Sequence, residues 1–549
     1  MTETVGYQIA RALADMGVTT VFGVISIHNM PVLDGIAVQG RIRFVAARGE
    51  SGAMSMADAY SRVSGGVGVA ITSTGTAAGN AAGAQAEALT AGSRVLHITT
   101  QIDREFMDRD RAAIHDVPKQ PEMLRGVSKA VLRIWDEKSA IGTLEAAMRM
   151  AITPPSGPVS LEIPVDVQRL TAVPGYLARA PKAAIPGGDT ERLDDLAAMV
   201  KRAKRPMIWL GGGARGAQVE ATELVARGFG AVTSTQGRAV VPEANPATLG
   251  AFNMTPEARE IYAKSDLMIV VGTRLRGNET LNNRMELPQP LVQIDADATQ
   301  CGRNYPVDLF ICGDAAISLR ALLDRLPNQL DVDPQQSYDI AVARAKSEGA
   351  LRARLGPYQV IADHLLTVVP AGRHAWVRDV TISNSTFGNR YVQFAAPHLG
   401  VHALGGGIGQ GVAMGIGAAL ASDTRTVTLL GDGGTMLGMA ELITAVDEGA
   451  NITFLLMNDQ AYGVIENIQD AQYAGRRHYS KLKAPNFAKL CDALDLPHTR
   501  VDDITRFAEV FDASMTRSGP HLIEVDMTAI GPFAEAFGGP PAGAAGGKS

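Results

Sequence analysis

Two aspartates, Asp432 and Asp459, have around them the residue types that a metal and phosphate site needs. Asp432 stands between glycines in Gly431-Asp432-Gly433, and Asp459 lies in the segment 457–463. Carboxylate and carbonyl oxygens, together with phosphate oxygens, suit a hard cation such as Mg2+. The glycines let backbone amides approach a diphosphate group closely. A lone Gly-Asp-Gly is also typical of an ordinary turn, so both interpretations stay open at this point.

The residues before each aspartate indicate how the pair is positioned. Residues 426–430 and 452–457 are apolar and rich in β-branched side chains, which predicts two buried strands, and residues 436–449 between them have helical character. Parallel strands joined by a helix end at the same edge of a sheet, which is where open α/β sheets bind ligands. We therefore expect Asp432 and Asp459 to lie side by side at that edge.

Length and composition limit the class of protein. A chain of 549 residues predicts about three domains, and 46% hydrophobic with 20% charged residues is typical of soluble globular proteins. The net charge of −6, without blocks of like charge, argues against a nucleic-acid partner. No apolar run reaches the roughly 18 residues of a membrane span.

Cysteine use and the start of the chain bear on location. Cys301, Cys312 and Cys491 have neither the spacing of metal ligands nor that of a disulfide framework, which favours a reducing compartment. Residues 1–4 lack the charged and apolar regions of a signal peptide. We therefore expect a cytoplasmic enzyme that acts on a small molecule.

Strand-like runs alternate with amphipathic helical stretches along the chain, which predicts an α/β fold of parallel sheets flanked by helices. Breaks at 171–188 and 327–336 divide this pattern. The expected domains are 1–170, 190–328 and 350–530. Residues 531–549, small and rich in glycine, alanine and proline, are expected to form a flexible tail.

One carboxylate stands out in the first segment. Residues 44–46 and 68–72 predict strands, and a helix over 51–63 is expected to follow Glu50 directly. The second strand runs into a glycine-broken turn over 73–80. Taken alone, Glu50 is an ordinary first-turn residue, favoured there by the helix dipole.

This arrangement resembles the pyrimidine-binding domain of thiamine diphosphate (ThDP) enzymes of the acetolactate synthase, benzoylformate decarboxylase and benzaldehyde lyase group. Glu50 occupies the place of the family glutamate, and Gly75 and Asn80 match the family turn, whereas Thr74 and Thr76 stand where Gly-Pro is commoner. In that family a carboxyl beside the aminopyrimidine favours the imino tautomer, whose nitrogen removes the C2 proton of the thiazolium. The resemblance implies this role for Glu50.

The resemblance extends to the aspartates, because these enzymes carry a GDG triplet, then a helix and a strand, then a pair of asparagines. Here Asp459 replaces the second asparagine. The resemblance implies that Asp432, Asp459 and the carbonyl of Ala461 bind Mg2+. It also implies a set of residues around the diphosphate: Thr381, Ser383, Gly433, Gly434, Tyr462 and Gly463.

A glycine-rich turn over 404–411 precedes a helix expected over 412–420. By resemblance, Gly406 offers its carbonyl to the 4′-amino group, and Ile408 lies under the ring junction and forces the bent cofactor shape, which is a proximity effect. A tight turn before a helix is the structural interpretation of the same residues, and the two are compatible.

The middle segment contains a dinucleotide-like fingerprint. Residues 211–216 read GGGARG after an expected strand at 207–210, but the next expected strand, 231–234, ends without the acidic residue that an NAD site needs. The resemblance implies instead the central domain of ThDP enzymes, in which relatives hold FAD, ADP or nothing. Arg274 matches the first arginine of the flavin pattern and the second is out of register, so FAD is the less favoured alternative.

Substrate-side positions depart from the common members of the family. Ile27 and Ile465 stand where pyruvate decarboxylases carry acids, which argues against simple decarboxylation followed by protonation. Ile468 stands where acetolactate synthases place a tryptophan, and those enzymes have a glutamine near the position of His115, so acetolactate formation is not favoured. His28 lies in a loop where benzaldehyde lyase and a cyclohexanedione-cleaving hydrolase carry a histidine that handles the acyloin or diketone oxygen. His28 and His115 are therefore catalytic candidates, with surface histidines as the alternative.

These features favour a ThDP- and Mg2+-dependent lyase or carboligase that forms or cleaves a C–C bond next to a carbonyl in a 2-oxo acid, acyloin or 1,2-diketone. A non-oxidative 2-oxo acid decarboxylase is the alternative, and a non-catalytic binding subunit with this fold is the alternative from another class. In relatives the glutamate of one subunit meets the diphosphate site of another, so a homodimer or homotetramer is expected, without a nucleic-acid or membrane partner.

Overall fold

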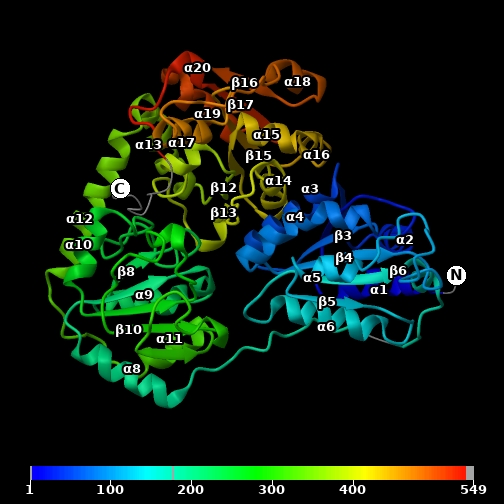
Figure 1. Cartoon of the computed structure of the whole chain (residues 1–549), viewed down its shortest axis with the longest axis horizontal. Helices are drawn as coiled ribbons and strands as arrows, with labels where there is room; N and C mark the ends of the chain where they lie inside the picture. Colours follow the sequence, from blue (N-terminus) through cyan, green and yellow to red (C-terminus); the bar gives the residue numbers. More distant parts are fainter. Residues whose placement is uncertain (1–2, 176–177, 539–549) are drawn as a thin grey trace.

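The computed structural model describes residues 3–175 and 178–538. The last part of the expected tail, residues 539–549, lies outside the described residues. Within the described parts the chain forms three parallel sheets, each flanked by helices (Figure 1). The expected α/β fold class is therefore confirmed.

The first sheet has the strand order β2-β1-β3-β4-β6-β5. Its strands are β1 (Thr20–Gly23), β2 (Arg43–Ala46), β3 (Gly68–Thr72), β4 (Val95–Gln101), β5 (Ala130–Arg133) and β6 (Val159–Pro164). The helices of this part are α1 (Val5–Asp15), α2 (Met30–Gln39), α3 (Glu50–Ser64), α4 (Thr76–Ala91), α5 (Gln120–Arg125), α6 (Ala140–Ile152) and α7 (Val165–Arg169). The expected turn at 73–80 is shorter than predicted, because α4 already begins at Thr76 and carries Asn80.

The second sheet has the order β11-β10-β9-β7-β8. Its strands are β7 (Pro206–Leu210), β8 (Gly230–Thr233), β9 (Leu267–Val271), β10 (Leu291–Asp295) and β11 (Leu309–Cys312). The helices are α8 (Thr190–Arg202), α9 (Gln218–Ala226), α10 (Pro256–Lys264), α11 (Ala315–Leu323) and α12 (Gln336–Ala353). The expected start of the third domain, residue 350, lies inside α12, which packs on α10.

The third sheet has the order β13-β12-β14-β15-β17-β16. Its strands are β12 (Trp376–Arg378), β13 (Gly400–His402), β14 (Thr426–Gly431), β15 (Ile452–Asn458), β16 (His498–Val501) and β17 (His521–Asp526). The helices are α13 (Gln359–Ala371), α14 (Gly411–Ala421), α15 (Asp432–Gly438), α16 (Leu442–Asp447), α17 (Gly463–Gln472), α18 (Phe487–Ala493), α19 (Phe507–Met515) and α20 (Met527–Ile530).

The two strands predicted before the aspartates are present and adjacent. β14 and β15 are almost wholly buried and pair in parallel, with Gly431 opposite Met457. The single helix expected over 436–449 is wrong in detail. Helical structure starts at Asp432, where the helix dipole favours an acid, and a 3-10 turn, Met439–Glu441, separates α15 from α16.

Helices α3 and α14 join the first sheet to the third (Figure 1). α14 is buried along nearly its whole length and consists mainly of glycine, alanine and other small apolar residues. A Cβ atom on Gly417 would overlap the carbonyl oxygen of Met56 in α3. The two helix backbones can therefore approach this closely only because position 417 has no side chain.

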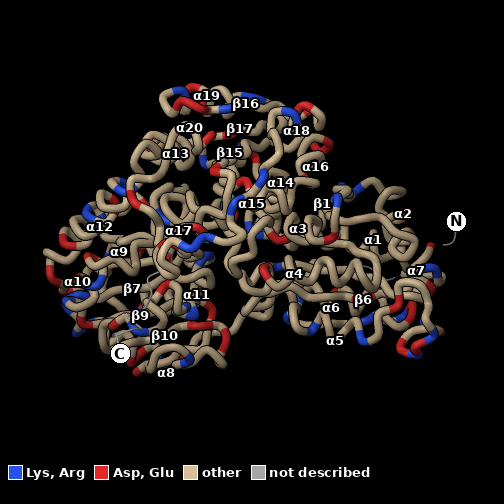
Figure 2. The backbone as a smooth tube through the Cα atoms, turned by 45° about the horizontal axis from the view of Figure 1, so that its top comes forward, with Lys and Arg blue, Asp and Glu red and all other residues tan. Residues whose placement is uncertain are grey.

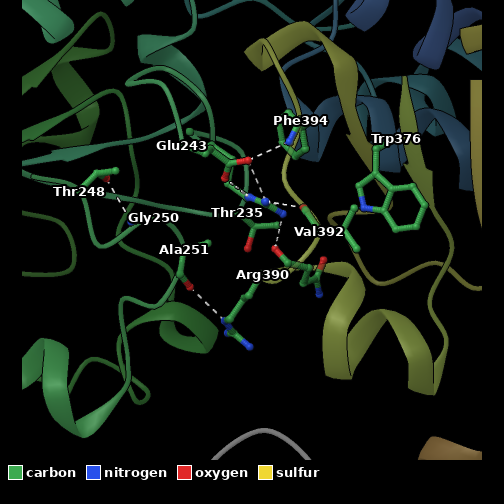
Figure 3. A network of polar contacts seen from close by, with 12 residues as sticks. Thr235, Glu243, Thr248, Gly250, Ala251, Trp376, Arg390, Val392 and Phe394 are labelled. Carbon is green, nitrogen blue, oxygen red and sulfur yellow. Dashed lines mark hydrogen bonds and ion pairs between the residues drawn. The ribbon is translucent and has the colours of Figure 1, made fainter. Parts of the chain in front are cut away.

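A buried ion pair of the second part forms hydrogen bonds with the third part (Figure 3). The Arg238 guanidinium bonds Glu243 at 2.7 Å and donates to the carbonyls of Asn389 (2.8 Å) and Val392 (2.6 Å), while Phe394 N donates to Glu243 Oε2 at 3.0 Å. Since both charged groups are paired and hydrogen-bonded, their burial is tolerated. This network ties the loop after β12 to the second sheet.

Charged residues of both signs are interspersed over all three parts of the chain (Figure 2). Among the described residues, no helix combines the length and apolar character that crossing a membrane requires.

The close approach of α3 and α14 predicts the effect of adding one methyl group. Gly417→Ala should lower the stability of the protein by about 1–3 kcal/mol, because the added Cβ meets backbone rather than a flexible side chain. Gly349→Ala in α12 is the matched control: its Cβ would meet nothing within 4 Å, so the alanine should stabilise its helix by about 0.5–1 kcal/mol. Thermal unfolding of both variants measures the difference. Equal melting temperatures would contradict the role of Gly417.

Candidate active site in two halves

Asp432 and Asp459 lie at the carboxyl edge of the third sheet, at the ends of neighbouring strands. Asp432 is 1% exposed, and neither of its carboxylate oxygens has a hydrogen-bond partner among the described residues. Burial raises the pKa of both carboxyls, and the negative charge of Asp432 raises that of Asp459 further. Two acids placed together without a counter-charge fit a bound cation.

The cation would need oxygens beyond these two side chains. In the part of the chain that the structure describes, no group of three or more His, Cys, Asp or Glu side chains could hold a metal ion. Asp459 Oδ1 accepts a hydrogen bond from Ala461 N at 3.3 Å, so the backbone of Ala461 lies beside it. A backbone carbonyl and phosphate oxygens are therefore the ligands that could complete such a site.

Glycines pack closely against Asp459 and against the neighbouring Tyr462. A Cβ on Gly463 would overlap Asp459 Oδ2, and one on Gly433 would lie 2.6 Å from the ring of Tyr462. Larger residues would fill the space where a diphosphate could approach the backbone.

The loop after β12 supplies hydroxyl groups at the same edge. Ser383 is fully buried and its hydroxyl has no partner among the described residues, while Thr381 Oγ1 accepts from Ser383 N at 3.2 Å. A Cβ on Gly431, at the end of β14, would lie 3.3 Å from Thr381, so this loop borders the aspartates. A buried hydroxyl without a partner is a free donor, which an anionic ligand would satisfy.

Asp379 was not recognised from the sequence. It is fully buried, and burial raises the pKa of its carboxyl to about 6. Its oxygens accept from Val380 N at 2.8 Å and from Gly409 N at 3.1 Å, and a Cβ on Gly434 would lie 2.6 Å from Asp379 Oδ2. Asp379 therefore holds the glycine-rich turn that carries Ile408 against the start of α15. Its place just after β12, at the ligand-binding edge, is the signal that could have identified it.

Three arginines hold the segment that leads into the same turn. They donate to alternate carbonyls along β13 and just beyond it: Arg215 to Gly400, Arg62 to His402 and Arg276 to Leu404. Gly405 N donates to Glu87 Oε1 at 2.6 Å. Gly406, with φ +83°, and Ile408, which is 39% exposed, follow this anchored segment.

A second group of predicted residues lies at the carboxyl edge of the first sheet. Glu50 is the first residue of α3, and its Oε2 accepts from Asn80 Nδ2 at 3.1 Å. The rings of His28 and His115 meet edge to face with centroids 5.1 Å apart. Gly75, with φ +66°, packs on the His115 backbone, where a Cβ would overlap the carbonyl oxygen.

His28 is the buried member of the histidine pair. It is 6% exposed, and its Nδ1 has no partner in the described part of the chain. Burial lowers its pKa and the neighbouring His115 lowers it further, so neutral imidazole is favoured at pH 7. A neutral ring with a free nitrogen can accept or donate one hydrogen bond to a ligand.

The structure does not join the two groups within one chain. We call Glu50, Asn80, Gly75, His28 and His115 the first half-site. The second half-site comprises Thr381, Ser383, Gly406, Ile408, Asp432, Gly433, Gly434, Asp459, Ala461, Tyr462 and Gly463. Across the described residues, no hydrogen bond or ion pair links Glu50 to any member of the second half-site. Exposed apolar side chains lie close in sequence to both half-sites: Ile25 and Ile27 precede His28, Leu437 lies in α15, and Ile465 follows Gly463.

The glycine run 211–216 has a structural explanation. Gly213 N donates to Gly272 O at 2.9 Å, and a Cβ on Gly213 would lie 2.9 Å from Gly272 Cα, so two turns of the second sheet pack closely. A cavity of about 430 Å³ lies beside them, lined also by Arg274 and Asp295. Burial raises the pKa of Asp295 to about 6.

The chain matches three family models. They are described as the N-terminal TPP binding domain (residues 3–123), the central domain (193–322) and the C-terminal TPP binding domain (381–525) of thiamine pyrophosphate enzymes. Thiamine pyrophosphate is another name for ThDP, so the resemblance stated from the sequence is confirmed.

Curated relatives cover nearly the whole chain. A probable 2-ketoarginine decarboxylase of Pseudomonas aeruginosa is 29% identical over 535 residues, covering 95% of this chain and 94% of the relative. The chloroplastic acetolactate synthase 3 of Brassica napus is 24% identical over 551 residues, covering 94% and 82%. The chloroplastic acetolactate synthase of Arabidopsis thaliana is 24% identical over 549 residues, covering 94% and 80%.

The raised pKa of Asp379 predicts a pH-dependent difference between wild type and Asp379→Asn. Folding raises this pKa from an ordinary value of 3.8 to about 6, so the folded state holds an extra proton in that window and loses the associated stability as the pH rises through it. From pH 8 to pH 5 the wild type should gain about 1–1.5 kcal/mol relative to the Asn variant. Thermal unfolding of both proteins at the two pH values measures this. A difference that does not change with pH would contradict the buried carboxyl.

Proposed function

Because the chain belongs to the family of thiamine pyrophosphate enzymes, we propose that it is a ThDP- and Mg2+-dependent lyase or carboligase. The reaction would form or cleave the C–C bond next to a carbonyl in a 2-oxo acid, an acyloin or a 1,2-diketone. The observation that carries the proposal is the buried carboxyl of Asp432 beside Asp459, whose oxygens have no donor partner among the described residues. Membership of an enzyme family speaks against the non-catalytic alternative.

The residues of the second half-site fit the cofactor's diphosphate and metal. Asp432, Asp459 and the carbonyl of Ala461 would bind Mg2+. Ser383 has a buried hydroxyl that would donate to a phosphate oxygen, with Thr381 beside it. The remaining contacts would come from backbone and ring groups that leave room for the ligand: Gly433, Gly434, Tyr462 and Gly463.

ThDP, when bound, supplies a nucleophilic C2 carbon and a thiazolium that accepts electrons. Glu50 would hold and transfer a proton at its carboxylate, since Asn80 restrains Oε2 and Oε1 is left for the cofactor ring. Gly406 would orient the aminopyrimidine through its carbonyl, and Ile408 would support the bent cofactor. His28 and His115 would hydrogen-bond the substrate oxygen, with His28 entering as a neutral ring.

We propose a homodimer or homotetramer in which the first half-site of one subunit meets the second half-site of another. The exposed apolar side chains near both half-sites support this, since such residues are typical of surfaces covered by a partner. Cys301, Cys312 and Cys491 are free thiols, which supports a cytoplasmic location.

We propose that the second sheet works without a flavin. Arg276 is the arginine that lies nearest in sequence to the expected second arginine of the flavin pattern, and it donates hydrogen bonds to the carbonyls of Leu404 and Thr90. The glycine run 211–216 is explained by the close packing of two turns. A purified protein with an absorbance band at roughly 450 nm would refute this, because oxidised flavins absorb there.

A non-oxidative 2-oxo acid decarboxylase is the second candidate. The relative named as a probable 2-ketoarginine decarboxylase, which aligns over almost all of both chains, favours it. The apolar Ile27 and Ile465 favour ligation, because neither supplies a proton. Separate incubations of the enzyme with four kinds of substrate distinguish the candidates: pyruvate; the 2-oxo acid that corresponds to arginine; benzoin-type acyloins; and cyclic diketones. Aldehyde and CO2 without acyloin would establish the decarboxylase.

The second carboxylate predicts a graded response at position 459. Asp459→Ala removes a cation ligand, so the affinity for ThDP at fixed Mg2+ should fall at least about tenfold, since even indirect partners of a metal are worth about 10–100-fold. Asp459→Asn, the residue that most relatives carry, keeps an oxygen ligand and should bind ThDP within a few-fold of wild type. Calorimetric titration with ThDP measures both. Wild-type affinity in the alanine variant would refute the assignment.

A site built from two subunits predicts complementation between inactive variants. Glu50→Gln and Asp432→Ala should each lower kcat by at least about 100-fold, because one removes the proton carrier and the other a metal ligand. Mixing and reassociating them should restore about a quarter of wild-type activity, since half the dimers are mixed and each has one intact site of two. Full activity in Glu50→Gln alone would overturn the mechanism. No recovery in mixed dimers verified by mass spectrometry would overturn the shared site.

A further inference from the structure

The start of α3 rests on a buried carboxylate from the third part of the chain. Glu441 is 4% exposed and ends the 3-10 turn that follows α15. Its Oε1 accepts from Arg48 N at 3.0 Å and from Gly49 N at 3.1 Å, and its Oε2 accepts from the Thr444 hydroxyl at 2.7 Å. Arg48 and Glu441 are 393 positions apart in sequence.

The hydrogen bonds between the Glu441 carboxylate and the amides of Arg48 and Gly49 are of a strong type and require a defined geometry. Hydrogen bonds from amides to a carboxylate are roughly twice as strong as neutral ones, and two successive backbone N–H groups form a concave anion site. A Cβ on Gly52 would overlap Glu441 Oε1, so the carboxylate lies directly on the first turn of α3. Burial raises the pKa of Glu441, while the hydroxyl and the two amides lower it.

The position of this contact gives it a consequence for the reaction. Glu50 follows Gly49 directly and is the first residue of α3, so the backbone that Glu441 holds is the backbone from which the Glu50 side chain extends. We propose that Glu441 is a positioning residue that fixes Glu50 for proton transfer; this rests on the role proposed above for Glu50. A displacement of about 1 Å at a reacting group can cost about 100-fold in rate.

The alternative is that Glu441 only stabilises the interface between the first and third parts of the chain, without an effect on Glu50. Two side-chain ion pairs lie nearby between the first and third parts of the chain: the exposed pair of Arg48 with Asp447, and Arg43 with the less exposed Glu448. Exposed pairs of this kind contribute little to stability. Asp447→Asn therefore provides a matched control: it removes a carboxylate from the same interface and the same partner residue without touching the backbone amides.

The holoenzyme variants Glu441→Ala, Glu441→Gln and Asp447→Asn separate these roles. Glu441→Ala should lower kcat by about 30–100-fold with KM unchanged, and Asp447→Asn should stay within twofold of wild type. Glu441→Gln should stay within about fivefold, because a single oxygen already accepts both amides. If the alanine variant does not fold, Glu441→Asp, one methylene too short to reach both amides, should show the same loss in kcat.

Two further measurements test whether Glu441 acts through the start of α3, and the first of them does not depend on turnover. In the cofactor-free protein, amide hydrogen exchange of the peptide covering residues 48–52 should quicken in Glu441→Ala and not in Asp447→Asn. Combining Glu441→Ala with Glu50→Gln should add less than about a twofold loss, since the first change acts through the second residue.

Two outcomes would overturn the proposal. If hydrogen exchange and kcat in Glu441→Ala match those in Asp447→Asn, Glu441 only stabilises the interface and does not position Glu50. Losses that multiply in the double variant would show that Glu441 does not act through Glu50. If Glu50→Gln itself keeps full activity, the proposed function fails, and the exchange measurement still decides whether Glu441 holds the start of α3.

Discussion

The contact between α3 and α14 is the constraint on which the arrangement of both half-sites depends. α3 begins with Glu50, and α14 begins directly after the turn that holds Ile408. The packing of these two helices therefore fixes the position of Glu50 in the first half-site relative to Ile408 in the second. Gly417 allows the helix backbones to touch, so the first and third sheets are joined through closely packed helices. Any movement of one sheet against the other would displace a residue of each half-site.

Among the described residues of one chain, no hydrogen bond or ion pair connects Glu50 with the second half-site. The helices that connect the two sheets occupy the space between them, and Glu50 reaches only Asn80 among the described residues. Asp432 meanwhile keeps two buried oxygens without partners. Asp459 adds a second carboxyl to this cluster, and burial together with the charge of Asp432 raises its pKa to about 8. The folded monomer thus carries an electrostatic cost that a cation would offset.

Local patterns in the sequence predicted the parts of the structure that are themselves local. The apolar runs before Asp432 and Asp459 became adjacent buried strands, and Glu50 opens its helix, because strand and helix signals need only neighbouring residues. Asp379 and Glu441 escaped notice, since the contacts that reveal their roles are with backbone amides 30 and 393 positions away, Gly409 and Arg48, which leave no residue pattern. The glycine run 211–216 is ambiguous for the opposite reason: a close approach of two turns requires the same residue type as a phosphate site.

The arginines along β13 have a consequence beyond holding the turn that follows it. β13 is the edge strand of the third sheet, and an edge strand offers unpaired carbonyls to any strand from another molecule. Arg215, Arg62 and Arg276 already occupy its alternate carbonyls, and their charged groups make the edge unsuitable for a further strand. At this margin the sheet is thereby protected from edge-to-edge pairing with a strand of another molecule.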